Sequence, residues 1–217
     1  MKNNKILKIN EIFKSIQGES THSGLPCTFI RLTYCNLRCT YCDTEYAFHE
    51  GNDMSITQIL DHIKPMGTKL VEVTGGEPML QDNTVSLMQE LLKNNYDVLL
   101  ETSGAISLKD VPKDVKKIVD FKCPSSAMSD KNLWSIVDEL NDKDEIKFVI
   151  GNLEDYEWTK SKIDKYGLNK KWVVLFSPVF GKISLEKLAD WILEDNLDVR
   201  LQLQMHKYIW DPDKRAV

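Results

Sequence analysis

Three closely spaced cysteines are the part of this sequence most suited to chemistry. Cys35, Cys39 and Cys42 follow the pattern C-x3-C-x2-C, and no fourth cysteine follows them until Cys123. A structural zinc site is closed by four protein ligands. Cysteine thiolates also hold iron–sulfur clusters, and a four-iron cluster held by only three thiolates keeps one iron open to a small molecule. The spacing therefore favours a reactive iron–sulfur centre.

Two alternatives to an iron–sulfur centre are a zinc site, which would require a fourth ligand, and a disulfide, which would require oxidation of the thiols. Zinc would need Cys27, His22 or His49, and none of these stands at the paired spacing that zinc sites favour. The odd total of five cysteines argues against a framework of disulfides. Cys27 and Cys123 are too few to hold a second cluster, and we expect Cys123 to be a small residue of the cofactor pocket.

Length and charge narrow the classes of protein that this chain can belong to. With 217 residues we expect a single domain over 1–217. A formal charge of −5 without a basic stripe argues against a nucleic-acid partner. No apolar run approaches the roughly 20 residues that span a bilayer, so we expect no membrane partner. Reduced thiols without a signal-peptide pattern predict a cytoplasmic protein.

Apolar strand patterns and amphipathic helix patterns alternate along the chain. Strands are predicted at 28–33, 70–73, 98–101, 117–121, 146–150, 172–176 and 199–204. Helices are predicted at 56–63, 83–94, 133–140, 152–167 and 184–193. The segment from Ile9 to Ser20 is too short and too polar to predict a core element. This alternation predicts an α/β fold with a largely parallel sheet.

Small and polar residues follow the predicted strands. Thr74-Gly75-Gly76-Glu77 is one such group, and Thr102-Ser103-Gly104 is the next. Because the carboxyl ends of parallel strands share one edge, we expect these groups and the thiols to form a single concave rim. Arg31, inside the first predicted strand, carries a planar guanidinium that suits a bound carboxylate.

These motifs resemble those of the radical S-adenosylmethionine (SAM) superfamily: the three cysteines with Tyr41 before the last, and the Gly-Gly-Glu group at 74–78. Residues 12–19, 101–104 and 204–208 resemble the 7-carboxy-7-deazaguanine synthases, a family of queuosine and deazapurine biosynthesis. The matching pieces run in order from about Ile9 to the C-terminus. The resemblance implies a radical SAM core, which is a partial, TIM-like (β/α)6 barrel.

The resemblance also implies an activity. A radical SAM lyase of this family contracts the ring of 6-carboxy-5,6,7,8-tetrahydropterin to 7-carboxy-7-deazaguanine and releases ammonia. Its cofactors would be a [4Fe–4S] cluster, SAM and Mg²⁺. A reductant such as flavodoxin and a homodimer are the implied partners. The alternatives are an activating enzyme that installs a glycyl radical, which has no use for Gln17-Gly18-Glu19 or Arg31, and a zinc-stabilised binding module.

Residue roles follow from the same resemblance, which implies no catalytic side chain because the radical comes from SAM. The cluster ligands would be Cys35, Cys39 and Cys42, and Thr44 would bind Mg²⁺. SAM would contact Tyr41, Cys42, Asp43, Thr74, Gly76, Glu77, Gly104, Ser125 and Ser126. The substrate would contact Ile16, Gln17, Gly18, Glu19, Arg31, Thr102, His206 and Val217. Ser20 stands where the family often has glycine, so we expect an altered local turn.

Overall fold

All nine strands of the described part of the chain join one open sheet. The computed structural model describes residues 5–217, and the strand order is β3-β1-β2-β4-β5-β6-β7-β8-β9. The strands are β1 (Ile6–Ile16), β2 (Pro26–Leu32), β3 (Asn52–Ser55), β4 (Leu70–Gly75), β5 (Asp97–Thr102), β6 (Lys116–Phe121), β7 (Glu145–Ile150), β8 (Val173–Pro178) and β9 (Arg200–Leu201). Strand β2 and strands β4 to β9 pair in parallel, whereas β1 pairs antiparallel with both β2 and β3. This confirms the predicted partial barrel.

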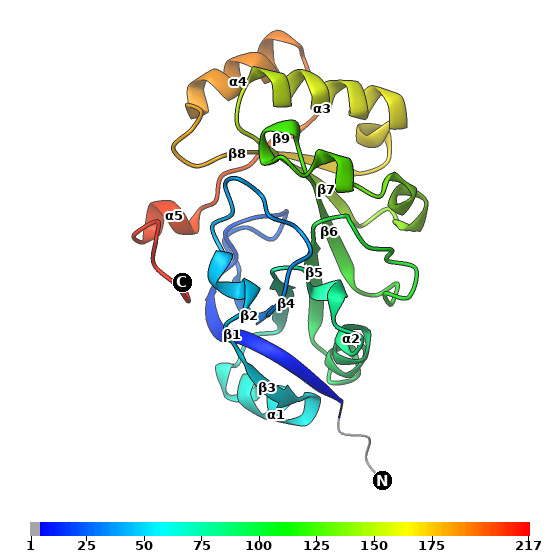
Figure 1. Ribbon diagram of the computed structural model, residues 1–217, viewed down its shortest axis with the longest axis vertical. Coiled ribbons are helices and arrows are strands. Elements are labelled where there is room, and N and C mark those ends of the chain that lie inside the picture. The colour runs from blue at the N-terminus through cyan, green and yellow to red at the C-terminus, as the bar shows by residue number, and fades with distance from the viewer. Residues whose placement is uncertain (1–4) are drawn as a thin grey trace.

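Five α-helices accompany the described strands: α1 (Ile56–Ile63), α2 (Thr84–Lys93), α3 (Leu153–Tyr166), α4 (Leu185–Glu194) and α5 (His206–Ile209). In Figure 1, α1 and α2 lie near the β3 end of the sheet, and α3 and α4 lie together at the β8–β9 end. The side chains of Ser55, Asn152 and Ser184 cap α1, α3 and α4, as such residues do at helix N-termini. None of these helices is long and apolar enough to cross a membrane.

The structure corrects four element predictions. Strand β1 was not predicted, because a bulge between Ile9 and Glu11 interrupts its alternation of buried and exposed residues. Strand β3 was also missed, and β9 has two residues instead of the predicted 199–204. The predicted helix at 133–140 is a 3₁₀ segment, Trp134–Glu139, and no side chain caps its N-terminus.

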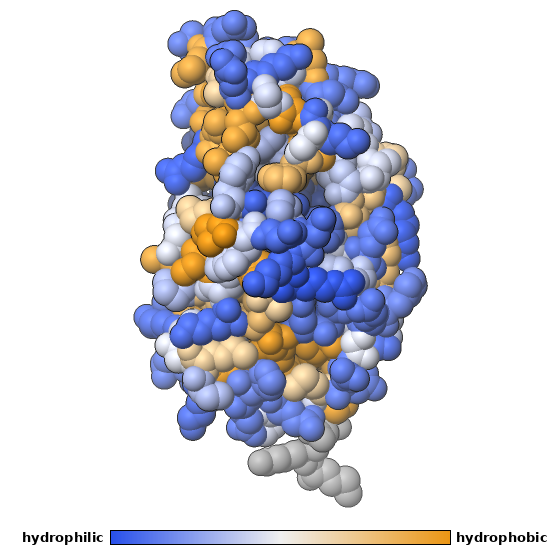
Figure 2. All heavy atoms as spheres, turned by 90° about the vertical axis from the view of Figure 1, so that its left-hand side faces the viewer, coloured by the Kyte–Doolittle hydropathy of each residue, from blue (hydrophilic) through white to orange (hydrophobic). Residues whose placement is uncertain are grey.

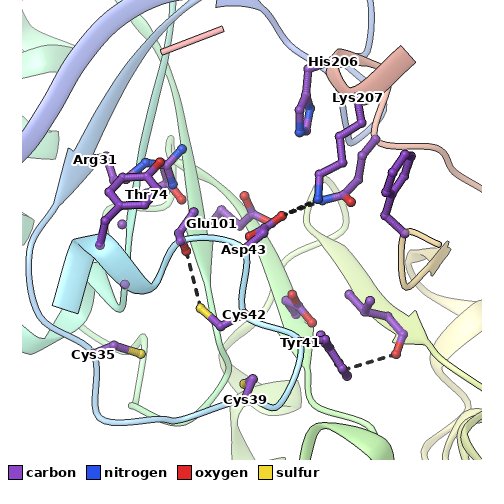
Figure 3. Close-up of a pocket in the computed structure, with 18 of the residues that line it drawn as sticks. Arg31, Cys35, Cys39, Tyr41, Cys42, Asp43, Thr74, Glu101, His206 and Lys207 are labelled. Carbon is purple, nitrogen blue, oxygen red and sulfur yellow. Dashed lines mark hydrogen bonds and ion pairs between the residues drawn. The ribbon is translucent and has the colours of Figure 1, made fainter. Parts of the chain in front are cut away.

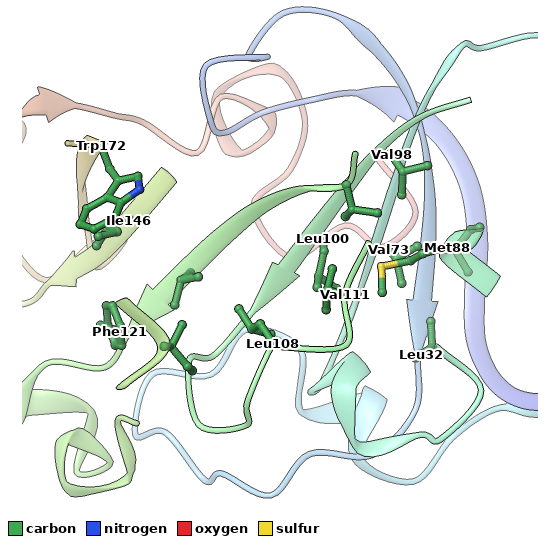
Figure 4. Packing of buried hydrophobic residues seen from close by; sticks show 14 of the residues in the cluster. Leu32, Val73, Met88, Val98, Leu100, Leu108, Val111, Phe121, Ile146 and Trp172 are labelled. Atoms are coloured by element: carbon green, nitrogen blue, oxygen red, sulfur yellow. The ribbon is translucent and has the colours of Figure 1, made fainter. Parts of the chain in front are cut away.

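The main core lies between the sheet and the helices. Leu32, Val73, Leu100 and Phe121 from successive parallel strands pack there, and Met88 joins them from α2 (Figure 4). Cys123 is also part of this core and is fully buried. It does not line the main cavity described below, so the prediction that it is a pocket residue was wrong.

The other face of the parallel strands builds the site in layers. Successive residues of a strand point to opposite faces. Cys27, Phe29, Leu70, Leu99 and Ile118 form a second apolar cluster, together with Phe13 of β1. The next inward-facing position along several of these strands is charged instead of apolar. The apolar layer thus lies at the amino ends of the strands, with a charged layer above it.

Candidate active site

The charged layer takes one residue from each of four neighbouring strands. Glu72 of β4, Glu101 of β5, Asp120 of β6 and Lys147 of β7 are all inward-facing, and each lines the main cavity or a smaller second cavity, which are described below. Strand registers hold them in place, because each belongs to a continuous parallel ladder. The apolar layer below and the thiol loop above therefore enclose a polar interior.

The main cavity has a volume of about 730 Å³ and contains all three predicted cluster ligands. The thiols come from the loop after β2 and lie around one space at the edge of the cavity (Figure 3). Thr40 ties this loop to the turn after β6. Its amide donates to Ser126 O at 3.1 Å, and its hydroxyl donates to Ser125 O at 2.6 Å.

The geometry of the thiols argues against the zinc alternative. Within residues 5–217, no three His, Cys, Asp or Glu side chains are close enough to hold a single metal ion. Cys27, one candidate for a fourth ligand, is buried in the second apolar cluster. Burial raises the pKa of the Cys39 thiol to about 11, so a metal must displace its proton. Three separated, partly exposed thiols suit a cluster better than one ion.

Gly75 and Gly76 bring β4 against the thiol loop. A Cβ added at Gly76 would lie 2.8 Å from Cys35 Cβ and would also overlap Tyr34 O. The backbone of Gly76 therefore approaches the first cysteine as closely as only glycine permits.

Gly76→Ala is expected to displace the thiol loop and to lower cluster content and SAM cleavage at least about tenfold, because neither neighbouring atom can move freely. Iron and sulfide analysis after anaerobic reconstitution checks this. Gly67→Ala is the control. Its φ is +69°, but nothing lies within 4 Å of the added Cβ, so a stability cost of about 1 kcal/mol with normal cluster content is expected. Normal cluster content in Gly76→Ala would contradict the close-approach argument.

The residues predicted to contact SAM divide into two groups. Those that line the main cavity are Tyr41, Cys42, Asp43, Thr74 and Gly76. Those that do not line either cavity are Glu77, Gly104, Ser125 and Ser126. The second group supports the wall from behind.

Glu77 shows this supporting role most clearly. Its carboxylate is fully buried and accepts hydrogen bonds from the Thr102 hydroxyl at 2.8 Å and from the Ser103 amide and hydroxyl at 2.8 and 2.6 Å. It thereby locks the loop after β5 to the loop after β4. Gly104 has a φ of +69°, and a Cβ there would lie 2.9 Å from Val119, so its contribution is also to packing.

Every residue predicted to contact the substrate lines one of the two cavities. A second cavity of about 80 Å³ is lined by residues that include Ile16, Gln17, Gly18 and Glu19. Arg31, Thr74, Glu101, His206 and Val217 line both cavities, and Thr102 lines the main one. The two spaces are therefore adjacent, with the thiols on one side and the Gln-Gly-Glu segment on the other.

Arg31 is oriented by a carboxylate behind it. Its Nε donates to Glu11 Oε1 at 2.7 Å, and the Tyr46 hydroxyl donates to the same oxygen at 3.0 Å. Across the described part of the chain, the two terminal nitrogens of Arg31 have no protein hydrogen-bond acceptor. The outer edge of the guanidinium is thus available to an anion in the cavity.

Lys147 is the centre of the charged layer. Its ammonium lies 2.6 Å from Glu19 Oε2, 2.5 Å from Glu101 Oε1 and 3.8 Å from Asp120 Oδ2. Burial alone would lower the pKa of Lys147, but these three carboxylates raise it well above its usual range.

Burial, together with Glu101 and Glu19, raises the pKa of Glu72 well above the usual range of a carboxyl group.

The C-terminal segment closes the cavity on the side of α5. Lys207 lies 2.8 Å from Asp43 Oδ2. Burial alone would raise the pKa of Asp43, but Lys207 and more distant cations lower it to about 2. Residues 212–217 line the main cavity, and Arg215 lies 3.7 Å above the Tyr46 ring. Hydrophilic atoms gather at the middle of the face that carries α5 and the C-terminus (Figure 2).

Sequence reasoning missed several charged residues of this site. They are Glu101, Asp120, Lys122, Lys147 and Lys207, all of which line the main cavity. Glu101 and Lys207 belong to the motifs at 101–104 and 204–208, so their positions after a strand and beside His206 were available signals. Lys147 lies inside an otherwise apolar strand, as Arg31 does, and the same argument applies to it.

The chain is similar to known proteins in both sequence and structure. Residues 29–192 match the sequence model of the radical SAM superfamily. The chain is 46% identical to a 7-carboxy-7-deazaguanine synthase of Koribacter versatilis, covering 97% of this chain and all of that protein. It is 42% identical to one of Clostridium acetobutylicum, covering 97% and 99%. The structure resembles QueE from Escherichia coli with a TM-score of 0.78 and 25% identity, covering 93% and 95%.

Proposed function

This chain belongs to the radical SAM superfamily and, within it, to the 7-carboxy-7-deazaguanine synthases, and from that membership we infer its reaction. It is a lyase that converts 6-carboxy-5,6,7,8-tetrahydropterin to 7-carboxy-7-deazaguanine with release of ammonia. The observation that carries this inference is the arrangement of three thiols on the wall of a cavity that leads to the Gln-Gly-Glu segment.

The residues present fit the cofactors. Cys35, Cys39 and Cys42 would hold the [4Fe–4S] cluster. Asp120 lines the main cavity, and its Oδ1 atom is buried and has no hydrogen-bond partner among residues 5–217. A hydroxyl or ammonium group of bound SAM would satisfy such an oxygen. When bound, the cluster and SAM supply the radical that begins the ring contraction.

The other half of the site fits the substrate. The outer edge of Arg31 would bind the substrate carboxylate through a paired, charge-assisted contact. Gln17, Glu19 and Glu72 surround the second cavity with donors and acceptors that suit the alternating edge of a pterin. Burial lowers the pKa of His206, which keeps its imidazole neutral and able both to donate and to accept.

Further parts of the proposal rest on family membership and composition. We propose that Thr44, which lines the main cavity, provides one oxygen ligand to Mg²⁺. We propose a homodimer, a flavodoxin-like reductant, a cytoplasmic location and a single domain, since all described strands join one sheet. The remaining residues assigned to SAM contacts act directly from the cavity wall or, like Glu77, from behind it.

Anaerobic turnover tests the reaction directly. The reconstituted enzyme is supplied with SAM, a reductant and carboxytetrahydropterin, and the product is detected by mass spectrometry. The product 7-carboxy-7-deazaguanine is expected. Reconstitution with stoichiometric zinc and no sulfide, or intact cluster without product, would exclude the assignment.

Arg31→Ala is expected to retain the cluster and uncoupled SAM cleavage but to weaken binding of the pterin about 100-fold, because a charge-assisted carboxylate contact is lost. Isothermal titration under anaerobic conditions measures the Kd. Arg31→Lys keeps the positive charge but loses the planar guanidinium with its two parallel donors, so it should recover little affinity for the pterin. Arg200→Ala removes an exposed arginine of β9 and is the control. An unchanged Kd in Arg31→Ala would remove Arg31 from this role.

A further inference from the structure

The segment that carries the predicted substrate contacts is anchored at the edge of the sheet farthest from the thiols. Residues 17–25 connect β1 to β2 and lie at the amino ends of the parallel strands; we call them the floor hairpin. Gln17, Gly18 and Glu19 of this hairpin line the second cavity. Their position therefore depends on whatever fixes the rest of the hairpin.

The strongest anchor is Glu145, the first residue of β7. It is fully buried, and its two carboxylate oxygens accept from the Thr21 amide at 3.2 Å each. The Thr21 hydroxyl also donates to Glu145 Oε1. Lys116, the first residue of β6, lies 2.5 Å from the same oxygen and donates to Thr21 Oγ1 at 2.7 Å. The first residues of β6 and β7 thus both hold Thr21 of the floor hairpin.

The backbone just before Thr21 turns toward the second cavity and has its own contacts there. Ser20 has a φ of +61°, and its amide donates to Gln202 Oε1 at 2.7 Å. Gln202 in turn donates to Glu19 Oε2 at 3.2 Å. A Cβ at Gly18 would lie 2.5 Å from His206 Nδ1, so the hairpin also fits tightly against the C-terminal segment.

We propose that Glu145 is a positioning residue for substrate binding: through Thr21 and Lys116 it fixes the floor hairpin, and hence Gln17 and Glu19, in the second cavity. This rests on the proposed function. Glu145 lines neither cavity. Its influence on the reaction passes only through the hairpin and should appear in the binding of the pterin, not in the cluster or in SAM cleavage.

The neighbouring residue provides a matched control. Asp144 is also buried, and it lies 2.8 Å from Lys117 of β6. Its other contacts are the amides of Lys117 at 2.9 Å and of Asn141 at 2.8 Å. It therefore shares the burial and the lysine partner of Glu145, but its hydrogen bonds and ion pair all lie outside the floor hairpin.

The test compares Glu145→Gln, Thr21→Val and Asp144→Asn in the anaerobic holoenzyme. Glu145→Gln is expected to raise the KM for carboxytetrahydropterin about tenfold, with cluster content, SAM KM and uncoupled SAM cleavage unchanged. Thr21→Val alters an exposed residue, so it should fold normally, and its pterin KM should rise by a smaller factor. Asp144→Asn should lower the melting temperature without changing the pterin KM.

Hydrogen exchange of residues 17–25 gives a readout that does not need turnover. Exchange there should be faster in Glu145→Gln than in the wild type and unchanged in Asp144→Asn. An unchanged pterin KM in both Glu145→Gln and Thr21→Val, an equal rise in Asp144→Asn, or unchanged exchange in Glu145→Gln would overturn the proposal. Absence of wild-type turnover would instead exclude the proposed function, while the exchange comparison would still decide whether Glu145 fixes the hairpin.

Discussion

Cys39→Ala is expected to yield a folded protein that retains no four-iron cluster and cleaves no SAM. The middle cysteine lies on the cavity wall with the other two, and the two remaining cysteines, Cys27 and Cys123, are buried in the apolar clusters. With two thiolates a cluster is no longer held securely. Reconstitution followed by absorbance, iron and sulfide analysis and detection of 5′-deoxyadenosine measures both losses.

Cys123→Ala separates the loss of a ligand from the loss of any thiol. Cys123 is fully buried in the main core, with its sulfur 3.5 Å from Thr159 Oγ1. This variant should lose some stability and keep a full cluster. A full cluster in Cys39→Ala, or an empty one in Cys123→Ala, would require a different ligand set.

Lys147→Met is expected to destabilise the protein by about 3–5 kcal/mol and to lower turnover at least about 100-fold, because Glu19 and Glu101 would lose the buried charge between them. Chemical denaturation and steady-state kinetics measure the two effects. Lys160→Met is the control: Lys160 pairs with Asp195 at the surface, 2.6 Å away, so its loss should cost less than about 1 kcal/mol.

Lys147→Met should also change how stability and activity depend on pH. Burial alone would raise the pKa of Glu101, but Lys147 lowers it below the usual range. A carboxyl group whose pKa is lower in the folded state than in the unfolded state stabilises the fold. This stability is fully present above the unfolded-state pKa of about 4.3 and is lost as the pH falls through the folded-state pKa. Without Lys147 the pKa of Glu101 should rise, and the acid limb of the activity profile should move toward neutral pH. An unmoved acid limb would show that Glu101 is not controlled by Lys147.

The parts of the site that could be predicted are those encoded by short segments. The thiol loop, Gly75–Gly76 and Arg31 each combine a residue type with a place at or in a strand, and all of them line the main cavity or approach it closely. The alternation of strands and helices likewise predicted the parallel half of the sheet. Local patterns sufficed there because each element carries its own periodicity.

The parts that could not be predicted depend on contacts between distant segments. Glu19 and Lys147 meet only because the floor hairpin crosses from β1 and β2 to β7. Glu77 was predicted to contact SAM, and its hydrogen bonds from the hydroxyls of Thr102 and Ser103 were not predicted. These partners come from a different strand, so the type and spacing of Glu77 alone do not indicate them.

The link from Thr40 to the turn after β6 has a consequence for the cost of binding the cluster. It holds the cysteine loop through two hydrogen bonds that involve no metal. A zinc finger must order its chain when the ion arrives, whereas here much of that entropic cost has been met by folding. Cluster binding should therefore cost less loop entropy here than it would in a chain whose ligands are disordered.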